Sequence, residues 1–219
     1  MIKWFRKNKK KYPDFWNAYI DHFDTIEKTP INETRFVAFD TETTGFDILK
    51  DRVLSIGAVA FKGKSIPVND SLELYLKQDI FNRDSVEIHE IIKSSTVDKV
   101  TELEAIKIFL SYIKNAVLIA HHSNFDKNMM NEMLSRHGLG KLKNKFIDTG
   151  VLFNKSKHII YHENLKDHYS LDDLCKALNV PKVDRHTASG DALITGIVFL
   201  KILSRLDKRK HLQWSYLLK

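Results

Sequence analysis

The stretch FVAFDTETTGFD, residues 36 to 47, decides the fold. A mostly apolar run typical of a buried strand ends at Asp40, Glu42 follows two residues later, and Thr-Thr-Gly then breaks the pattern. Successive side chains of a strand point to opposite faces, so we expect Asp40 and Glu42 to share one face. Carboxylates that close repel each other, and burial raises the pKa of at least one. The pattern favours a cation between them; the alternative is a pair of solvated turn residues.

Length and composition favour a single soluble domain. The chain has 219 residues, of which 43% are hydrophobic, enough to bury a full core. Its one cysteine, Cys175, excludes an internal disulfide and is typical of a reducing compartment. No apolar run approaches the length of a membrane span, and the basic N-terminus lacks the apolar stretch of a secretory signal. We therefore expect a cytoplasmic protein without membrane contact.

The positive charge of the chain is concentrated at its N-terminus. Residues 1–12 carry six basic residues and no acid, and removing these six from the 35 basic residues leaves 29 against 28 acidic ones. Trp4, Phe5 and Tyr12 are interleaved with the charges. Such an arm is suited to hold a nucleic-acid backbone and to stack on bases. The alternative is a solvated terminus with no binding role.

Hydrophobic periodicity predicts an α/β order of elements. We expect strands at 36–40, 53–61, 71–76, 116–120 and 146–148, and helices at 13–26, 101–115, 125–137, from 170 and at 188–206. The first three strands are close enough to form an antiparallel meander, and the whole order implies a mixed central sheet flanked by helices. The polar segment 150–169 has no clear pattern. We divide the chain into a basic arm with an N-terminal helix (1–34), a main domain (35–206) and a C-terminal tail (207–219).

Two further aspartates stand at the ends of predicted elements. Asp126, in LIAHHSNFDKNMM, follows a buried strand and opens a helix. Asp191, in RHTASGDALITG, lies in the first turn of the last helix, five residues after His186. The helix dipole also favours an acid there, so either aspartate alone can be purely structural. Four acids that converge at one edge of a sheet suit Mg²⁺ or Mn²⁺, and two such ions form a site that cleaves phosphodiesters.

Three motifs, DTETTG, HHSNFD and HTASGD, resemble the exonuclease motifs of the DEDDh (DnaQ-like) 3′–5′ exonucleases, a branch of the ribonuclease H-like fold. The resemblance covers residues 35 to 205, and the interval from His186 to Asp191 is the family's third-motif spacing. SVEIHEI, which contains His89, resembles a family segment that approaches the substrate, and FIDTGVL resembles the strand leading out of the second half. The resemblance implies a ribonuclease H-like fold and an enzyme that releases nucleoside monophosphates from 3′ ends.

The resemblance also implies roles for particular residues. Two Mg²⁺ or Mn²⁺ ions would be bound by Asp40, Glu42, Asp126 and Asp191. His186 would take a proton from the attacking water, a task suited to a neutral imidazole near pH 7. The 3′-terminal nucleotide and nearby substrate would contact Thr43, Thr44, Gly45, Phe46, His89, His121 and Phe125. Phe46 either stacks on the terminal base or packs in the core. His122 and Ser123 replace the Asn and Ala usual in the second motif, a departure that concerns substrate positioning.

Two other functions are alternatives to this one. A polymerase-associated subunit that only binds is disfavoured because all five catalytic residue types are present. A different two-metal enzyme, such as an RNA endonuclease, is disfavoured by the spacing of the third motif. DNA and RNA remain alternative substrates, and proofreading, repair and RNA trimming remain alternative roles. The terminal QWSYLLK faintly resembles peptides that dock on sliding clamps; Gln213, Leu217 and Leu218 carry this weak hypothesis against simple packing of the tail.

Overall fold

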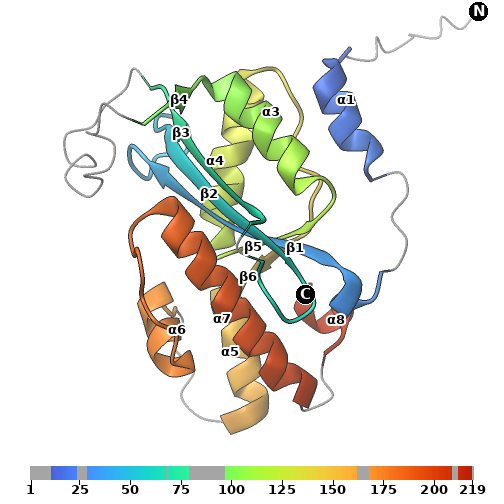
Figure 1. Cartoon of the computed structure of the whole chain (residues 1–219), viewed down its shortest axis with the longest axis vertical. Coiled ribbons are helices and arrows are strands. Elements are labelled where there is room, and N and C mark those ends of the chain that lie inside the picture. Colours follow the sequence, from blue (N-terminus) through green and yellow to red (C-terminus); the bar gives the residue numbers. More distant parts are fainter. Residues whose placement is uncertain are drawn as a thin grey trace, which may run out of the picture.

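The computed structural model describes residues 11–23, 29–67, 69–78, 97–161, 168–208 and 212–218. In this part of the chain a mixed sheet runs in the order β4-β3-β2-β1-β5-β6, with helices on both faces (Figure 1). The strands are β1 (Arg35–Thr43), β2 (Val53–Lys62), β3 (Ser71–Leu76), β4 (Lys99–Val100), β5 (Val117–Ala120) and β6 (Phe146–Asp148). β1, β2 and β3 form the antiparallel meander, and β5 and β6 continue the sheet in parallel beside β1. The predicted mixed α/β sheet is confirmed.

The helices begin and end largely where local signals predict. They are α1 (Asp14–Asp21), α3 (Glu102–Ile113), α4 (Ser123–Arg136), α5 (Thr149–Tyr161), α6 (Leu171–Leu178), α7 (Ala188–Lys208) and α8 (Trp214–Leu217). Thr101 and Ser170 each form a capping box at the start of α3 and α6. The first helix ends at Asp21, short of the predicted residue 26; residues 24–28 lie outside the described part. The segment from 150, which has no clear pattern in sequence, begins as helix α5.

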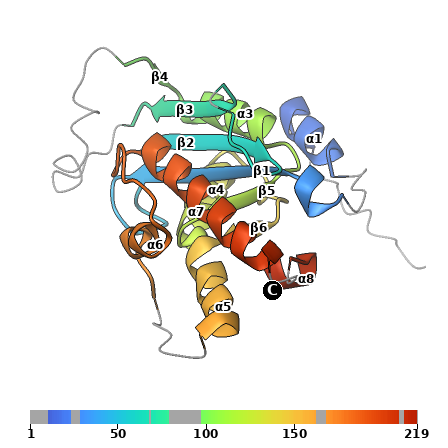
Figure 2. The same ribbon diagram turned by 60° about the horizontal axis from the view of Figure 1, so that its bottom comes forward.

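Alternation along β1 divides the core into two layers. Val37 and Phe39 pack with residues of α1, α3 and α4, whereas Phe36 and Ala38 pack with residues of α5, α6 and α7. Figure 2 shows the sheet between these two groups of helices. The side-chain period of two means that Asp40 and Glu42 continue the series facing α7, while Thr41 continues the series facing α4.

Helix α1 packs into the main core. Its Trp16 and Tyr19 are buried together with residues of α3. The Tyr19 hydroxyl donates to Asn144 Oδ1 at 2.6 Å and accepts the Lys143 amide at 2.8 Å. Tyr12, which the sequence associates with the basic arm, lies with its ring centroid 5.8 Å from that of Trp16. Tyr12 therefore packs against the fold, and residues 1–10 of the arm lie outside the described part.

The C-terminal tail also packs on the domain. Leu217 of α8 is only 3% exposed and belongs to the core layer of α5, α6 and α7. The Trp214 indole donates to the Thr29 carbonyl at 3.1 Å, and its ring lies 6.1 Å from Phe36. The side chain of Leu217, one of the residues that carry the clamp hypothesis, is thus buried in the core and not exposed to a partner. Among the described residues, no helix combines the length and the apolar character needed to cross a membrane.

Candidate active site

Three acids from two elements meet at the end of β1. Asp40 and Glu42 are half-buried on that strand, and Asp191 is buried in the first turn of α7. One carboxylate oxygen from each lies within 4.8 Å of those of the other two. His186 lies in the turn just before α7, where it is exposed and has a left-handed backbone with φ of 67°. The third motif thus contributes Asp191 to the acid cluster and places His186 on the surface before α7.

Asp126 lies outside this group of three and is held from the other face of the sheet. It belongs to α4 and is 3% exposed. Its Oδ1 accepts the Thr41 amide at 3.1 Å and the Thr41 hydroxyl at 2.8 Å. Because Thr41 stands between Asp40 and Glu42 but faces the opposite layer, it fastens α4 to the end of β1. Asp126 is the nearby charge with the largest effect in raising the pKa of Asp40.

The electrostatics of these acids call for a positive charge. Burial raises the pKa of Asp40 well above its ordinary value, and the charges of Asp126, Asp191 and Glu42 raise it further. Burial likewise raises the pKa of Glu42 to about 8 and that of Asp126 to about 7. Among the described residues, the buried Oδ1 of Asp191 has no hydrogen-bond partner. An all-oxygen, charge-crowded set with an unpartnered oxygen fits a hard divalent cation such as Mg²⁺ or Mn²⁺.

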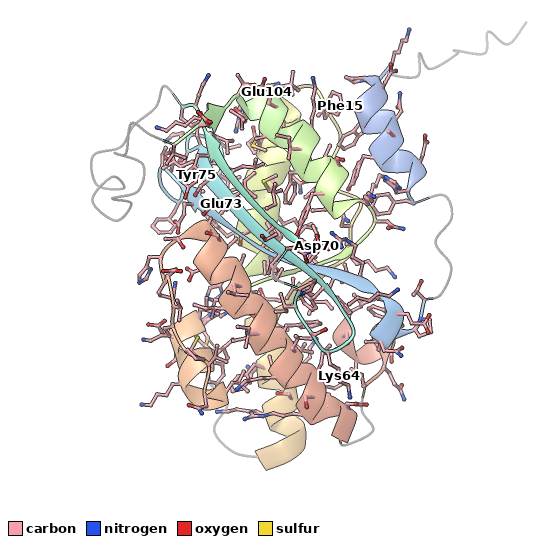
Figure 3. All side chains as sticks on the ribbon, in the orientation of Figure 1. Phe15, Lys64, Asp70, Glu73, Tyr75 and Glu104 are labelled. Carbon is pink, nitrogen blue, oxygen red and sulfur yellow. The ribbon has the colours of Figure 1, made fainter. Side chains whose placement is uncertain are left out.

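A glycine lets α7 approach the sheet closely enough to bring Asp191 to β1. Gly57 of β2 is the cross-strand partner of Asp40. A Cβ at this position would lie 2.1 Å from the Ala188 carbonyl carbon, so no side chain fits. On the other side of Gly57, Glu73 of β3 accepts a hydrogen bond from the Ser189 hydroxyl. The first turn of α7 therefore packs on three residues that are paired across β1, β2 and β3, namely Asp40, Gly57 and Glu73. Glu73 is labelled on β3 in Figure 3.

The loop after β1 presents an exposed aromatic ring. Asp51 accepts the Thr44 hydroxyl at 2.7 Å and the Asp47 amide at 2.8 Å, which ties the loop across its neck. Phe46 at its tip is 89% exposed, with its ring centroid 5.9 Å from that of Phe125. Core packing, one of the two alternatives for Phe46, is therefore excluded. The ring is open to solvent beside Phe125 of the second motif.

Residues of the second motif also line a cavity. A cavity of about 580 Å³ is lined by residues including His122, Phe125, Asp148 and Tyr169. Asp148 accepts the backbone amides of Ser123 at 2.7 Å and Gly150 at 2.9 Å, so it holds the starts of α4 and α5 together. His121 Nδ1 lies 3.0 Å from the Thr149 hydroxyl. Of the predicted substrate contacts, His89 alone lies outside the described residues.

We expect His121 to reduce stability in acid. Burial, helped by the charge of His122, lowers the pKa of His121 to about 4. Between pH 6.5 and pH 4 this histidine is protonated in the unfolded state but not in the folded state. The free energy of unfolding therefore decreases as the pH falls through that range. On going from pH 8 to pH 4.5, the free energy of unfolding of His121→Gln should therefore rise by about 2 kcal/mol relative to that of wild type. Urea unfolding of both proteins at the two pH values measures this, and a pH-independent difference would contradict it.

Four residues outside the predicted set of site residues shape the site: Thr41, Gly57, Asp148 and Arg185. Thr41 had a signal, since alternation places it opposite Asp40 and Glu42. Arg185 directly precedes His186, and its Nη1 donates to Asp191 Oδ2. Gly57 lies inside the apolar run VLSIGAVAF, where only the three-dimensional approach of α7 distinguishes it from other strand residues.

Comparisons with known proteins agree with this geometry. The family model RNase_T, described as exonuclease, matches residues 37–199. The DNA polymerase III subunit epsilon of Treponema pallidum is 30% identical over 174 residues, which is 80% of this chain and 79% of that protein. The PolC-type DNA polymerase III of Caldanaerobacter subterraneus subsp. tengcongensis is 33% identical over 177 residues. That match covers 80% of this chain but 12% of the polymerase, so the chain spans a small part of the PolC-type relatives.

Solved structures share the fold. Exonuclease I superposes with a TM-score of 0.67 at 16% identity, covering 81% of this chain and 42% of that one. The complex of Escherichia coli exonuclease I with a dT13 oligonucleotide gives a TM-score of 0.65 at 17% identity, covering 81% and 43%. Family model, relatives and fold lead to one assignment. This chain belongs to the DEDDh-type (DnaQ-like) family of 3′–5′ exonucleases, which has the ribonuclease H-like fold.

Proposed function

We propose that this chain is a metal-dependent exonuclease that hydrolyses the 3′-terminal phosphodiester of a nucleic acid and releases nucleoside monophosphates. The observation that carries the proposal is the convergence of Asp40, Glu42 and Asp191 within 4.8 Å at the end of β1. Asp126, tied to the same strand end through Thr41, completes the acid set. DNA is the favoured substrate class, because the similar curated proteins are DNA polymerase III chains.

The four acids would hold two Mg²⁺ or Mn²⁺ ions, with Asp40 contributing to both. When bound, such ions neutralise charge on the phosphate, lower the pKa of the attacking water and stabilise the leaving oxygen. The chain contributes the positions of its carboxylates. Their burial and mutual repulsion disfavour the charged forms without a cation, so a bound cation would stabilise them. Without a cation this charge crowding is a cost to the fold, so binding also stabilises the folded state.

His186 is the proposed general base. Its imidazole is exposed and stands five residues before Asp191, and it would accept a proton from the attacking water. The hydroxyl of Thr187 donates to the Asp184 carbonyl at 2.7 Å and supports the turn that carries His186. Proton removal at that point makes the water a better nucleophile as it attacks.

The loop of Thr43, Thr44 and Gly45 would face the terminal nucleotide. Thr43 donates to the Gly45 carbonyl at 2.7 Å, so the backbone of this turn is held in one shape. Phe46, exposed beside Phe125, would stack on or wedge beside the terminal base. His121, His89 and the basic arm belong to the same proposal as further substrate contacts. The polymerase names of the relatives favour a proofreading role, in which a mispaired 3′ end is the preferred substrate.

A 5′-labelled single strand incubated with Mn²⁺ should shorten stepwise from its 3′ end, and EDTA should stop the reaction. His186→Ala should slow cleavage about 10²- to 10⁴-fold, the usual contribution of a general base, while Mn²⁺ still raises the melting temperature. Internal fragments from a strand with a blocked 3′ end would indicate an endonuclease instead. Binding of the strand without any metal-dependent cleavage would indicate a subunit that only binds.

Duplexes with a matched or a mismatched 3′ terminus, and an RNA strand of the same sequence, extend this assay to the proposed role. Faster removal of the mispaired nucleotide supports proofreading, because an unpaired end reaches the site without melting a base pair. Equal rates on both duplexes, or faster cleavage of RNA, would contradict that role and leave the exonuclease proposal in place.

A further inference from the structure

Arg185 forms an ion-pair bridge that no step of the proposed hydrolysis uses. Its Nη1 donates to Asp191 Oδ2, and its Nε donates to Asp172 Oδ1 at 2.8 Å. The side chain of Arg185 is 21% exposed and that of Asp191 is 10% exposed. The guanidinium thus connects the start of α6, where Asp172 lies, to the acid in the first turn of α7.

The charge of Arg185 reaches the whole acid cluster. It lowers the otherwise raised pKa of Asp40 and of Glu42, against burial and the neighbouring carboxylates. A guanidinium keeps its charge at any physiological pH and donates through a rigid fork, so it is a permanent counter-ion. It occupies one oxygen of Asp191 and leaves the other, Oδ1, buried without a hydrogen-bond partner among the described residues.

We propose that Arg185 is a positioning residue that serves as the counter-ion of Asp191 when the metal is absent and competes with the metal for that carboxylate. This inference rests on the proposed function, because it takes the acid cluster as a divalent-cation site. A divalent ion that approaches Asp191 meets the repulsion of a fixed positive charge and shares the carboxylate with it. Arg185 therefore stabilises the metal-free fold and weakens metal affinity, which keeps the acids in place while the site exchanges ions.

Lys182 offers a matched control. Its ammonium lies 3.2 Å from Asp172 Oδ2, so it touches the same bridge at the end remote from the metal site. It is half exposed, and within the described part of the chain it makes no hydrogen bond or ion pair with Asp191. Lys182→Gln removes one positive charge from Asp172, as Arg185→Gln does, but leaves the counter-ion of Asp191 in place.

The test is titration of the full chain with Mn²⁺ alone by calorimetry, together with melting in EDTA and in saturating Mn²⁺. Arg185→Gln should bind Mn²⁺ about tenfold more tightly than wild type, because the competing charge is gone. In EDTA it should melt about 3 to 6 °C lower than wild type, and saturating Mn²⁺ should largely remove that gap. Lys182→Gln should change the dissociation constant less than about twofold, and Arg185→Lys, which keeps the charge, should return Mn²⁺ affinity toward that of wild type.

Unchanged or weaker Mn²⁺ binding by Arg185→Gln, with equal loss of melting temperature in EDTA and in Mn²⁺, would overturn the inference and make Arg185 an ordinary structural residue. The failure of the proposed function itself looks different. In that case Asp40→Asn would bind Mn²⁺ as wild type does, or wild type would bind none. Mn²⁺ binding that depends on Asp40 but not on Arg185 overturns only the role of Arg185.

Discussion

Asp40→Asn should abolish cleavage while raising the melting temperature of the metal-free protein. Loss of a group that merely supports a metal ligand costs about 10- to 100-fold, so loss of a carboxylate proposed to serve both ions should cost more than about a hundredfold. Asn has almost the same shape as Asp, so the packing at the end of β1 is kept. The activity loss would then reflect the missing charge and ligand.

The stability gain follows from the crowding of acids around Asp40. Burial and three neighbouring carboxylates raise the pKa of Asp40 well above its ordinary value, so the folded state has to protonate this group or tolerate its charge. A neutral amide removes that cost, and we expect an increase of several degrees, since about 1 kcal/mol corresponds to 2–4 °C in a chain of this size. Mn²⁺ should stabilise wild type but have much less effect on the variant.

Melting in EDTA and in Mn²⁺, beside a 3′-end cleavage assay, measures both effects. Asp21→Asn is the matched control, because Asp21 is exposed at the end of α1 and belongs to neither the acid cluster nor its supports. It should leave rate and metal response unchanged. Cleavage at the wild-type rate by Asp40→Asn would refute the metal site, and a lower melting temperature in EDTA would refute the account of charge crowding.

Gly57→Ala should cost both stability and activity although it adds one methyl group to a strand. The added Cβ would lie 2.1 Å from the Ala188 carbonyl carbon and 2.2 Å from the Ser189 nitrogen, and these are backbone atoms that cannot rotate away. Either β2 or the first turn of α7 has to move. Forced overpacking costs about 1–3 kcal/mol. Displacement of Asp191 by about 1 Å from the acids of β1 should slow cleavage on the order of a hundredfold.

Gly196→Ala is the control, since it makes the same substitution within α7. There the nearest atom to the added Cβ is the flexible end of Ile66, at 3.1 Å, and alanine is the better helix former. We expect its melting temperature to stay within about 2 °C of wild type and its rate to be unchanged. A Gly57→Ala protein with the wild-type rate constant would show that the close approach of α7 does not set the position of Asp191.

The sequence predicts those parts of the fold that depend on local chemistry. Alternation marks β1, β2 and β3, and the capping box at Ser170 marks the start of α6. The positions of Asp126 and Asp191 at the first turns of α4 and α7 follow from the same helix-start signals. Periodicity and caps involve residues only a few positions apart, which is why they can be found without coordinates.

The remaining features depend on contacts between distant segments. The significance of Gly57 arises only when Ala188, more than a hundred residues later, packs against it. The two-residue β4 is too short for a period, and α5 begins in a polar segment whose start is tied by Asp148. In the sequence nothing distinguishes Arg185 from the other basic residues, because its role depends on contacts with Asp172 and Asp191 that form only in the folded structure. The meeting of Asp40, Glu42 and Asp191 can therefore be expected from sequence, whereas the roles of Gly57 and Arg185 beside them cannot.

The hydrogen bond between the Trp214 indole and the Thr29 carbonyl brings the two ends of the catalytic unit together. The chain enters the sheet just after Thr29 and leaves the last long helix just before Trp214, so entry and exit are neighbours. A unit closed in this way can be inserted into a host polypeptide at a single surface loop, since the host is not stretched. In the PolC-type polymerase of Caldanaerobacter subterraneus the matched segment is 12% of a much longer chain. Closure at Thr29 and Trp214 means that both connections of the unit leave from one place on its surface, so neither has to pass through the sheet that carries the acids.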